Sequence, residues 1–212
     1  MRTEDLIRGL AADTVRPTIL VGRRLLSGAI AGAVLAVVAF SLTLRARPDL
    51  SEASRSPACI CKLVVAASLA VTAGCLLPQA ARPVPIPGRR HAILLVAPVL
   101  LTFSVAAELY VQPAGIWWSR LLGENAIHCL WQIPFLAAAP ALCLLVALRH
   151  GAPGRPAVAG AVAGLVSGGF AAVLYGLTCP DDSPLFVATW YTIAIASVTA
   201  AMACAGTRLL RW

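Results

Sequence analysis

A stretch without formal charge, from Asn125 to Leu148, most constrains the fold of this chain. A helix needs roughly 20 apolar residues to cross a bilayer, so this stretch predicts a membrane-spanning helix. Similar stretches at residues 25–44, 58–77, 91–111, 157–178 and 185–207 predict further spans. Only 12% of the residues are charged, against roughly 25% in an ordinary soluble domain. We therefore expect an all-α, polytopic membrane protein with six transmembrane helices.

Basic residues are distributed unevenly between the two ends of these helices. If the N-terminus is cytoplasmic, its side carries twelve arginines, at positions 2, 8, 16, 23, 24, 82, 89, 90, 149, 155, 208 and 211. The opposite side then carries five basic residues, at positions 45, 47, 55, 62 and 120. Cytoplasmic loops carry an excess of Lys and Arg, so both termini are predicted to be cytoplasmic. This topology explains the net charge of +8 without a direct nucleic-acid partner.

Residues 1–24 precede the first apolar stretch and are interpreted as a cytoplasmic amphipathic segment, followed by a transmembrane domain at 25–212. Leu6, Ile7 and Leu10 fall on one face at helical spacing, with Arg8 among them. Such a helix either lies on membrane lipid or offers a docking face to a cytosolic partner. No cleavable signal peptide is expected, because the first apolar run begins late and is long enough to remain a span.

Small residues recur at four-residue spacing in two of the expected spans. Gly28 and Gly32 lie in the first span, and Gly160, Gly164 and Gly168 lie in the fifth. Such stripes let helix backbones approach closely in lipid, so we expect a packing role for both. If the stripe of the fifth span faces the fourth, it would bring those two helices close enough for a disulfide.

Cys129 and Cys179 are predicted to lie at the same depth, at the outer end of a hairpin formed by the fourth and fifth spans. Cys129 lies 24 residues before the turn at Pro153, and Cys179 lies 26 residues after it. At 1.5 Å of rise per residue, their depths differ by about 3 Å. A disulfide also requires α-carbons within about 7 Å, which spacing alone leaves open. Unpaired burial is the alternative, because free cysteines are often small core residues.

Polar residues near this pair suggest a second kind of chemistry. His128 precedes the first cysteine, and Asp181 and Asp182 follow the second in the loop CPDDSP. Two thiolates with help from nitrogen or oxygen could bind a thiophilic metal ion. The residues therefore leave a disulfide, metal binding at Cys129 and Cys179, and simple burial open.

The other cysteines give weaker signals. Cys59 and Cys61 enter the second span at the same outer level, but side chains two positions apart point to different faces of a helix. Cys75, Cys143 and Cys204 are expected to be packing residues.

Lys62 and Glu108 place charges inside apolar runs, near the outer ends of their spans. An intramembrane charge is a functional candidate by default, but these two could also snorkel to the headgroups or pair with each other. The chain contains no phosphate-binding glycine loop followed by lysine, no HExxH and no CxxC, so no catalytic motif gains support.

Several segments carry a resemblance to a known family. The segments ENAIHCL, IPFLAAAPALCLLVALRHGAP, PAVAGAVAGLVSGGFAAVLYGLTCPDDSPLFVATWY and GTRLLRW resemble the NrsF-type anti-sigma factors, and the opening RTEDLIRGLAAD is similar to their cytoplasmic start. The resemblance covers nearly the whole chain and is strongest from Glu124 to Trp212. Cys59, Cys61, Cys75, Cys143 and Cys204 are not part of the family pattern.

The resemblance implies a bacterial inner-membrane protein, not an enzyme, that holds an extracytoplasmic-function sigma factor inactive on the cytoplasmic side. By the same resemblance, it would regulate transcription in a stress response. Cys129 and Cys179 match the family's signal-sensing cysteines, which would respond to a redox or thiophilic-metal signal. No cofactor other than a transient metal ion is expected. The alternatives are a membrane thiol oxidoreductase, which would use Cys59 and Cys61 as an exchanging pair, and a small exporter.

Overall fold

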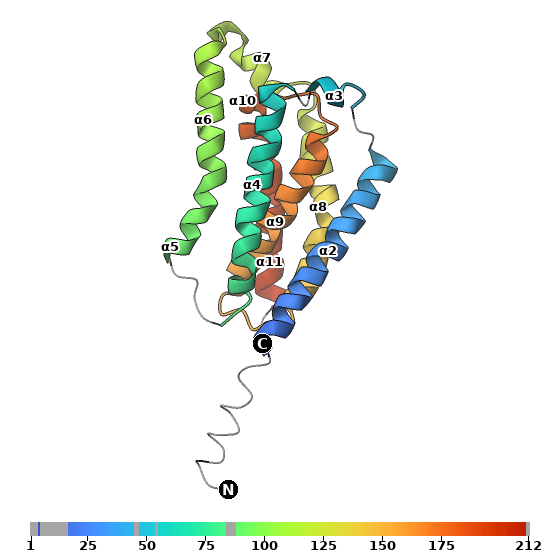
Figure 1. The fold of residues 1–212 in the computed structure, drawn as a ribbon, viewed down its shortest axis with the longest axis vertical. Helices are drawn as coiled ribbons and strands as arrows, with labels where there is room; N and C mark the ends of the chain where they lie inside the picture. The colour runs from blue at the N-terminus through green and yellow to red at the C-terminus, as the bar shows by residue number, and fades with distance from the viewer. Residues whose placement is uncertain (1–3, 5–16, 45–46, 54, 84–87, 211–212) are drawn as a thin grey trace.

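The computed structural model describes residues 4, 17–44, 47–53, 55–83 and 88–210 of the chain. Within these ranges all regular secondary structure is helical (Figure 1). A backbone in lipid must satisfy its N–H and C=O groups internally, and a helix does so within a single segment. The expected docking face of Leu6, Ile7, Arg8 and Leu10 lies outside the described residues.

Six helical segments are long and apolar enough to cross a membrane, which confirms the predicted fold class. Four of them are single helices: α2 (Pro17–Thr43), α4 (Pro57–Ala80), α8 (Ala126–Leu148) and α9 (Pro156–Gly176). The third span joins α5 (Gly88–His91), η1 (Ala92–Leu95) and α6 (Val96–Val111). The sixth joins α10 (Pro184–Phe186), a π-helical turn η3 (Val187–Tyr191) and α11 (Thr192–Leu209). Short helices α3 (Leu50–Ala53), η2 (Ala114–Ile116) and α7 (Trp117–Leu122) lie in the connections.

Proline accounts for several helix starts. Pro57, Pro156 and Pro184 stand at the beginning of α4, α9 and α10, where the missing N–H would have had no intrahelical partner. Pro78 lies inside the last turn of α4, which continues through it to Ala80. Pro78 removes a single intrahelical hydrogen bond, and the helix ends two residues later.

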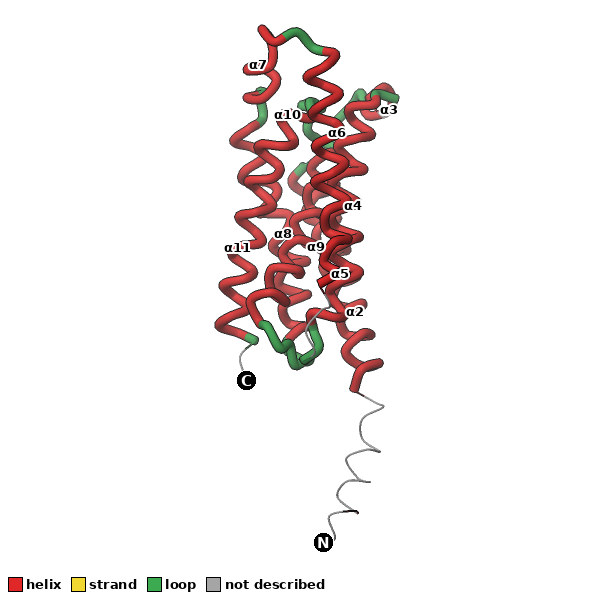
Figure 2. Tube along the Cα trace, turned by 90° about the vertical axis from the view of Figure 1, so that its left-hand side faces the viewer, coloured by secondary structure: helices red, strands yellow, loops and turns green. Residues whose placement is uncertain are grey.

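Helix α9 lies at the centre of the bundle and packs against α4, α8 and α11 (Figures 1 and 2). Its glycine stripe faces α11, since a Cβ added at Gly164 would lie 2.7 Å from the α-carbon of Thr199. On another face, a Cβ at Gly169 would lie 2.9 Å from the backbone nitrogen of Ala70 in α4. The stripe therefore faces the sixth span, so the condition under which it would bring the fourth and fifth spans together is not met. Because α9 carries small residues on several faces, spacing alone does not select the neighbour.

The glycines of α2 pack within the chain against α8. A Cβ at Gly28 would lie 3.0 Å from the carbonyl oxygen of Cys143, and one at Gly32 would lie 2.5 Å from the α-carbon of Pro140. Both glycines therefore allow α2 and α8 to approach closely. This is the packing role that the sequence predicted for them.

The bundle has two distinct ends (Figure 1). The beginning of α2, the end of α11 and the turn between α8 and α9 share one end, here named the basic end after Arg82, Arg149 and Arg155. Its turns are joined by hydrogen bonds, because the N–H of Gly154 donates to the carbonyl of Arg82 at 3.2 Å. The opposite end carries α3, α7 and α10 together with Cys129 and Cys179, and is named the thiol end.

Candidate functional site

Cys129 and Cys179 are both buried at the thiol end, and both are free thiols. Cys129 lies in the first turn of α8, and Cys179 lies three residues beyond the end of α9. Both residues lie at the thiol end of the hairpin formed by α8 and α9. The structure thus brings together the two thiols that the sequence singled out.

Aromatic rings enclose this pair. Tyr175 and Tyr191 both interact with the two thiols, and their ring centroids lie 5.7 Å apart. The ring of Phe186 packs edge-on against Tyr191 at 6.2 Å. The hydroxyl of Tyr191 is buried and makes no hydrogen bond to the described residues. The thiols therefore lie in a largely apolar environment that water does not reach.

Burial changes the ionisation of Cys179, which lies in the loop after α9. Desolvation raises the pKa of its thiol above the ordinary value, and the positive charge of Lys62 offsets only part of that increase. A thiol must be deprotonated to act as a nucleophile or metal ligand. Burial therefore favours the protonated form of Cys179 and lowers the fraction of reactive thiolate at neutral pH.

The loop that carries Cys179 is fastened to α4 and to the segment after α2 by buried charges. The ammonium group of Lys62, whose residue is only 2% exposed, donates to the backbone carbonyl of Cys179 at 2.9 Å and to Oδ1 of Asp182 at 2.5 Å. The guanidinium group of Arg47 donates to Oδ2 of the same carboxylate at 2.9 Å. Removing one partner from such a buried group leaves the others uncompensated, which is strongly destabilising.

Asp181 joins the same loop to the start of α8. Its Oδ2 accepts hydrogen bonds from the backbone N–H groups of Glu124 and Asn125, at 3.2 and 3.0 Å, and from the side-chain amide of Asn125 at 3.0 Å. A carboxylate at a helix N-terminus is stabilised by the orphan N–H groups and by the helix dipole. Cys129 follows four residues after Asn125, so Asp181 holds the two thiol-bearing segments together.

Glu108 fastens the far end of the loop to α6. Its carboxylate accepts from the hydroxyl of Ser183 at 2.7 Å and from the N–H of Leu185 at 2.9 Å, and it forms an ion pair with Arg120 at 2.7 Å. Lys62 and Glu108 therefore do not pair with each other, which was one of the expectations from sequence. Each charge instead binds the segment from Cys179 to Leu185, named here the CPDDSP loop.

The auxiliary residues do not assemble a ready-made metal site. His128 is exposed although its neighbour Cys129 is buried, and the carboxylates of Asp181 and Asp182 are already engaged by N–H groups and cations. Among the described residues, no three His, Cys, Asp or Glu side chains are grouped as metal ligands. The donors that fit a soft ion are the two thiolates, without the nitrogen and oxygen ligands that the sequence suggested.

The remaining cysteines are dispersed. Cys59 is buried and interacts with Asp182, whereas the sulfur of Cys61 lies 2.7 Å from the hydroxyl oxygen of Ser104 on α6. These two thiols therefore face different neighbours, as their spacing predicted. The expectation of packing residues is wrong for Cys75 and Cys204, whose side chains are exposed on the helix surface.

Comparison with known proteins identifies the family of the chain. The family model described as "Negative regulator of sigma F" matches residues 10–212. The chain belongs to the NrsF family. It is 37% identical over 221 residues to "Anti-sigma-F factor NrsF" of Caulobacter vibrioides, with both chains covered completely. It is 32% identical over 218 residues to "Probable anti-sigma-F factor NrsF" of Azospira oryzae, again with complete coverage of both. No solved structure matches the chain.

Membership in the NrsF family confirms the resemblance seen in the sequence. Several of the residues that build the site in this family member were nevertheless missed from sequence, namely Arg47, Tyr175, Ser183 and Tyr191. Nothing in the local pattern identified them, because Tyr175 and Tyr191 read as ordinary apolar-span residues and Arg47 reads as a loop cation. The loop CPDDSP, with two acids and no base, is the sequence signal that could have indicated basic partners elsewhere in the chain.

Proposed function

We propose that this protein is an inner-membrane anti-sigma factor that sequesters an extracytoplasmic-function sigma factor and releases it when Cys129 and Cys179 react. The observation that carries the proposal is the burial of these two free thiols at the same end of the bundle in an NrsF-family chain. The names of the Caulobacter and Azospira relatives support a sigma factor as the partner.

The proposed topology has both termini in the cytoplasm and the thiol end outside. The excess of arginine at the basic end supports it, because cytoplasmic loops carry that excess. The joined turns of Arg82 and Gly154 support a continuous basic surface there for the sigma factor. The N-terminal segment with Leu6, Ile7, Arg8 and Leu10 is proposed to complete this docking surface.

Two chemical events would convert the thiol pair. In the redox form, a two-electron oxidant such as a peroxide takes two electrons and two protons from Cys129 and Cys179, forming one S–S bond while the peroxide is reduced to two waters. In the metal form, a soft divalent ion displaces the two thiol protons and is held by both sulfurs. Either event converts the two buried, protonated thiols of the resting state into sulfur atoms bonded to each other or to a metal ion.

The free energy that the signal supplies can be compared with the free energy that a switch needs. Moving a partner from almost fully bound to almost fully free requires about 5.5 kcal/mol of bias between two states. A structural metal site supplies more than this, whereas a disulfide contributes typically about 2–4 kcal/mol. Metal capture would therefore release almost all of the sigma factor, and a disulfide would release part of it.

Replacement of the cysteines tests the proposal. We expect Cys129→Ser and Cys179→Ser to leave membrane insertion intact and to abolish induction of a sigma-dependent reporter by peroxide or by a soft metal. Cys75→Ser is the matched control, because that thiol is exposed and distant from the site. Normal induction in both site variants would remove the thiols from the mechanism.

Deletion of residues 2–16 tests the docking surface separately. If this segment holds the sigma factor, its removal gives constitutive expression of the sigma regulon even without a signal. Retained repression would assign binding to the basic turns alone.

A further inference from the structure

Helix α6 is the most weakly packed of the described spans. In its most apolar stretch 11% of the residues are buried, against 61% in α9. Of the residues in α6 itself, only Ala97 and Glu108 are buried. Its polar attachments to the bundle are the contact of Ser104 with Cys61 and the carboxylate of Glu108. Because lipid provides no hydrophobic drive for helix association, these few polar contacts determine where α6 lies.

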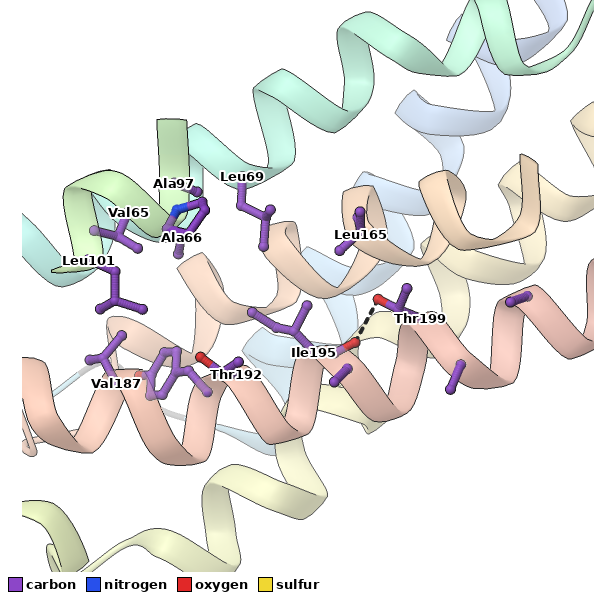
Figure 3. Close-up of a pocket in the computed structure, with 15 residues that line it drawn as sticks. Val65, Ala66, Leu69, Ala97, Leu101, Leu165, Val187, Thr192, Ile195 and Thr199 are labelled. Atoms are coloured by element: carbon purple, nitrogen blue, oxygen red, sulfur yellow. Dashed lines mark hydrogen bonds between the residues drawn. The ribbon is translucent and has the colours of Figure 1, made fainter. Parts of the chain in front are cut away.

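A cavity of about 480 Å³ separates α6 from α11 (Figure 3). Ala97 and Leu101 of α6 form one wall, Leu69 of α4 another, and Ile195 and Thr199 of α11 the third. The side chains that line it are mostly apolar and do not interlock across the space. This side of α6 therefore offers room for the helix to tilt, which the tightly packed contact between α9 and α11 does not.

The two ends of this span reach the two functional ends of the protein. At the thiol end, Glu108 accepts hydrogen bonds from Ser183 and Leu185 of the CPDDSP loop. At the basic end, the same span begins with Arg89 and Arg90 in α5. A continuous helical segment that is held at one end and free along one side can transmit a change at the first end to the second.

We propose that α6 is the element that carries the thiol signal across the membrane, and that Glu108 is the residue through which the CPDDSP loop controls it. This inference rests on the proposed function and adds the route of the signal. In the resting state Glu108 holds α6 against the loop. When Cys179 bonds to Cys129 or to a metal, the loop shifts, Ser183 and Leu185 leave Glu108, and α6 tilts into the cavity and displaces Arg89 and Arg90.

An epistasis experiment tests this route. The variant with Cys129→Ser and Cys179→Ser is expected to repress constantly and to ignore the signal. Adding Glu108→Leu removes both carboxylate oxygens to which Ser183 and Leu185 donate, so we expect expression of the sigma regulon to rise at least tenfold without any signal. Glu108→Gln keeps one acceptor oxygen and should give a smaller rise. Glu52→Leu is the matched control, because Glu52 is an exposed acid at the same end of the bundle and should leave repression unchanged.

The amount of each variant in the membrane is measured by immunoblot, so that release is separated from loss of the protein. If Glu108→Leu fails to accumulate, Ser183→Ala removes one of the loop's hydrogen bonds to Glu108 without changing any charge and should raise expression by a few-fold. Continued full repression in the accumulated variants would overturn the proposed route. A normal signal response in the cysteine variants alone would instead overturn thiol sensing.

Hydrogen–deuterium exchange provides a readout that does not depend on the sigma factor. In purified protein reconstituted in lipid nanodiscs, oxidation with diamide should accelerate exchange in peptides from residues 96–111, and Glu108→Leu should do so without oxidant. Peptides from α9 should change little, because α9 is packed on several sides. Unchanged exchange in α6 on oxidation would contradict its role as the moving element.

Discussion

The ammonium group of Lys62 lies 2.9 Å from the backbone carbonyl oxygen of Cys179, although 117 residues separate them in the chain. The same ammonium binds the carboxylate of Asp182, so one buried cation contacts both the thiol-bearing residue and the acid that follows it. A charge buried inside a membrane-spanning segment is expensive and is kept where it has a role. Here that role is to hold the CPDDSP loop closed over the thiols.

Replacing this cation should open the thiol site. In Lys62→Met, Arg47 is the one cation that still pairs with the carboxylate of Asp182. Breaking a buried ion pair costs about 3–5 kcal/mol. We expect labelling of Cys179 by a membrane-impermeant maleimide to become at least tenfold faster, measured by mass spectrometry of the labelled peptide. Arg55→Met is the control, since Arg55 is an exposed cation at the same end. Equal labelling rates in the two variants would argue against a closing role for Lys62.

Removing the acid that joins the two thiol segments should slow disulfide formation. In Asp181→Ala the N–H groups of Glu124 and Asn125 lose their acceptor, and loss of such a cap costs about 0.5–2 kcal/mol. Without this link, the segments that carry Cys129 and Cys179 are no longer joined by Asp181. The rate of diamide-driven disulfide formation, followed by gel shift after alkylation, should therefore fall. Glu124→Gln serves as the control, because the side chain of Glu124 is exposed.

The raised pKa of Cys179 predicts a distinct pH dependence. A variant that keeps Cys179 as its single cysteine should react with a small maleimide slowly at pH 7, and its rate should reach half of its maximum above the ordinary thiol pKa of about 8.5. Because burial favours the protonated thiol, the folded state binds more protons than the unfolded state between the two pKa values, so stability falls as the pH rises through this range. A half-maximal rate at or below pH 8.5 would contradict the effect of burial.

The contact between α9 and α11 should tolerate no larger residue. A Cβ at Gly164 would lie 2.7 Å from the α-carbon of Thr199, so Gly164→Leu forces two backbones apart. Overpacking of this kind costs typically 1–3 kcal/mol, and the thermal unfolding temperature in detergent should drop. Gly74→Leu is the matched control, since nothing lies within 4 Å of a Cβ at that position. A similar drop in both variants would assign the effect to helix propensity and not to packing.

Much of the architecture was predictable from the sequence. Hydropathy located all six spans to within a few residues, because the thickness of the bilayer sets the length of a helix that crosses it. The constant rise of a helix also predicted that Cys129 and Cys179 would reach the same end. The partners of Lys62 and Glu108 were not predictable, since one contacts Asp182 and the other Ser183 across long separations in the chain.

The amino-acid sequence by itself determined how often the chain crosses the membrane, where the charges stop each crossing and which two thiols meet at one depth. These properties depend on position along the helix axis, which the order of residues encodes directly. Only the tertiary structure decided that the glycines of α9 face α11, that Asp181 holds α8, and that Glu108 holds α6. Those contacts depend on how helices pack against one another in lipid. There, shape and a few polar groups determine which helices are neighbours, and no periodic pattern in the sequence predicts the pairing.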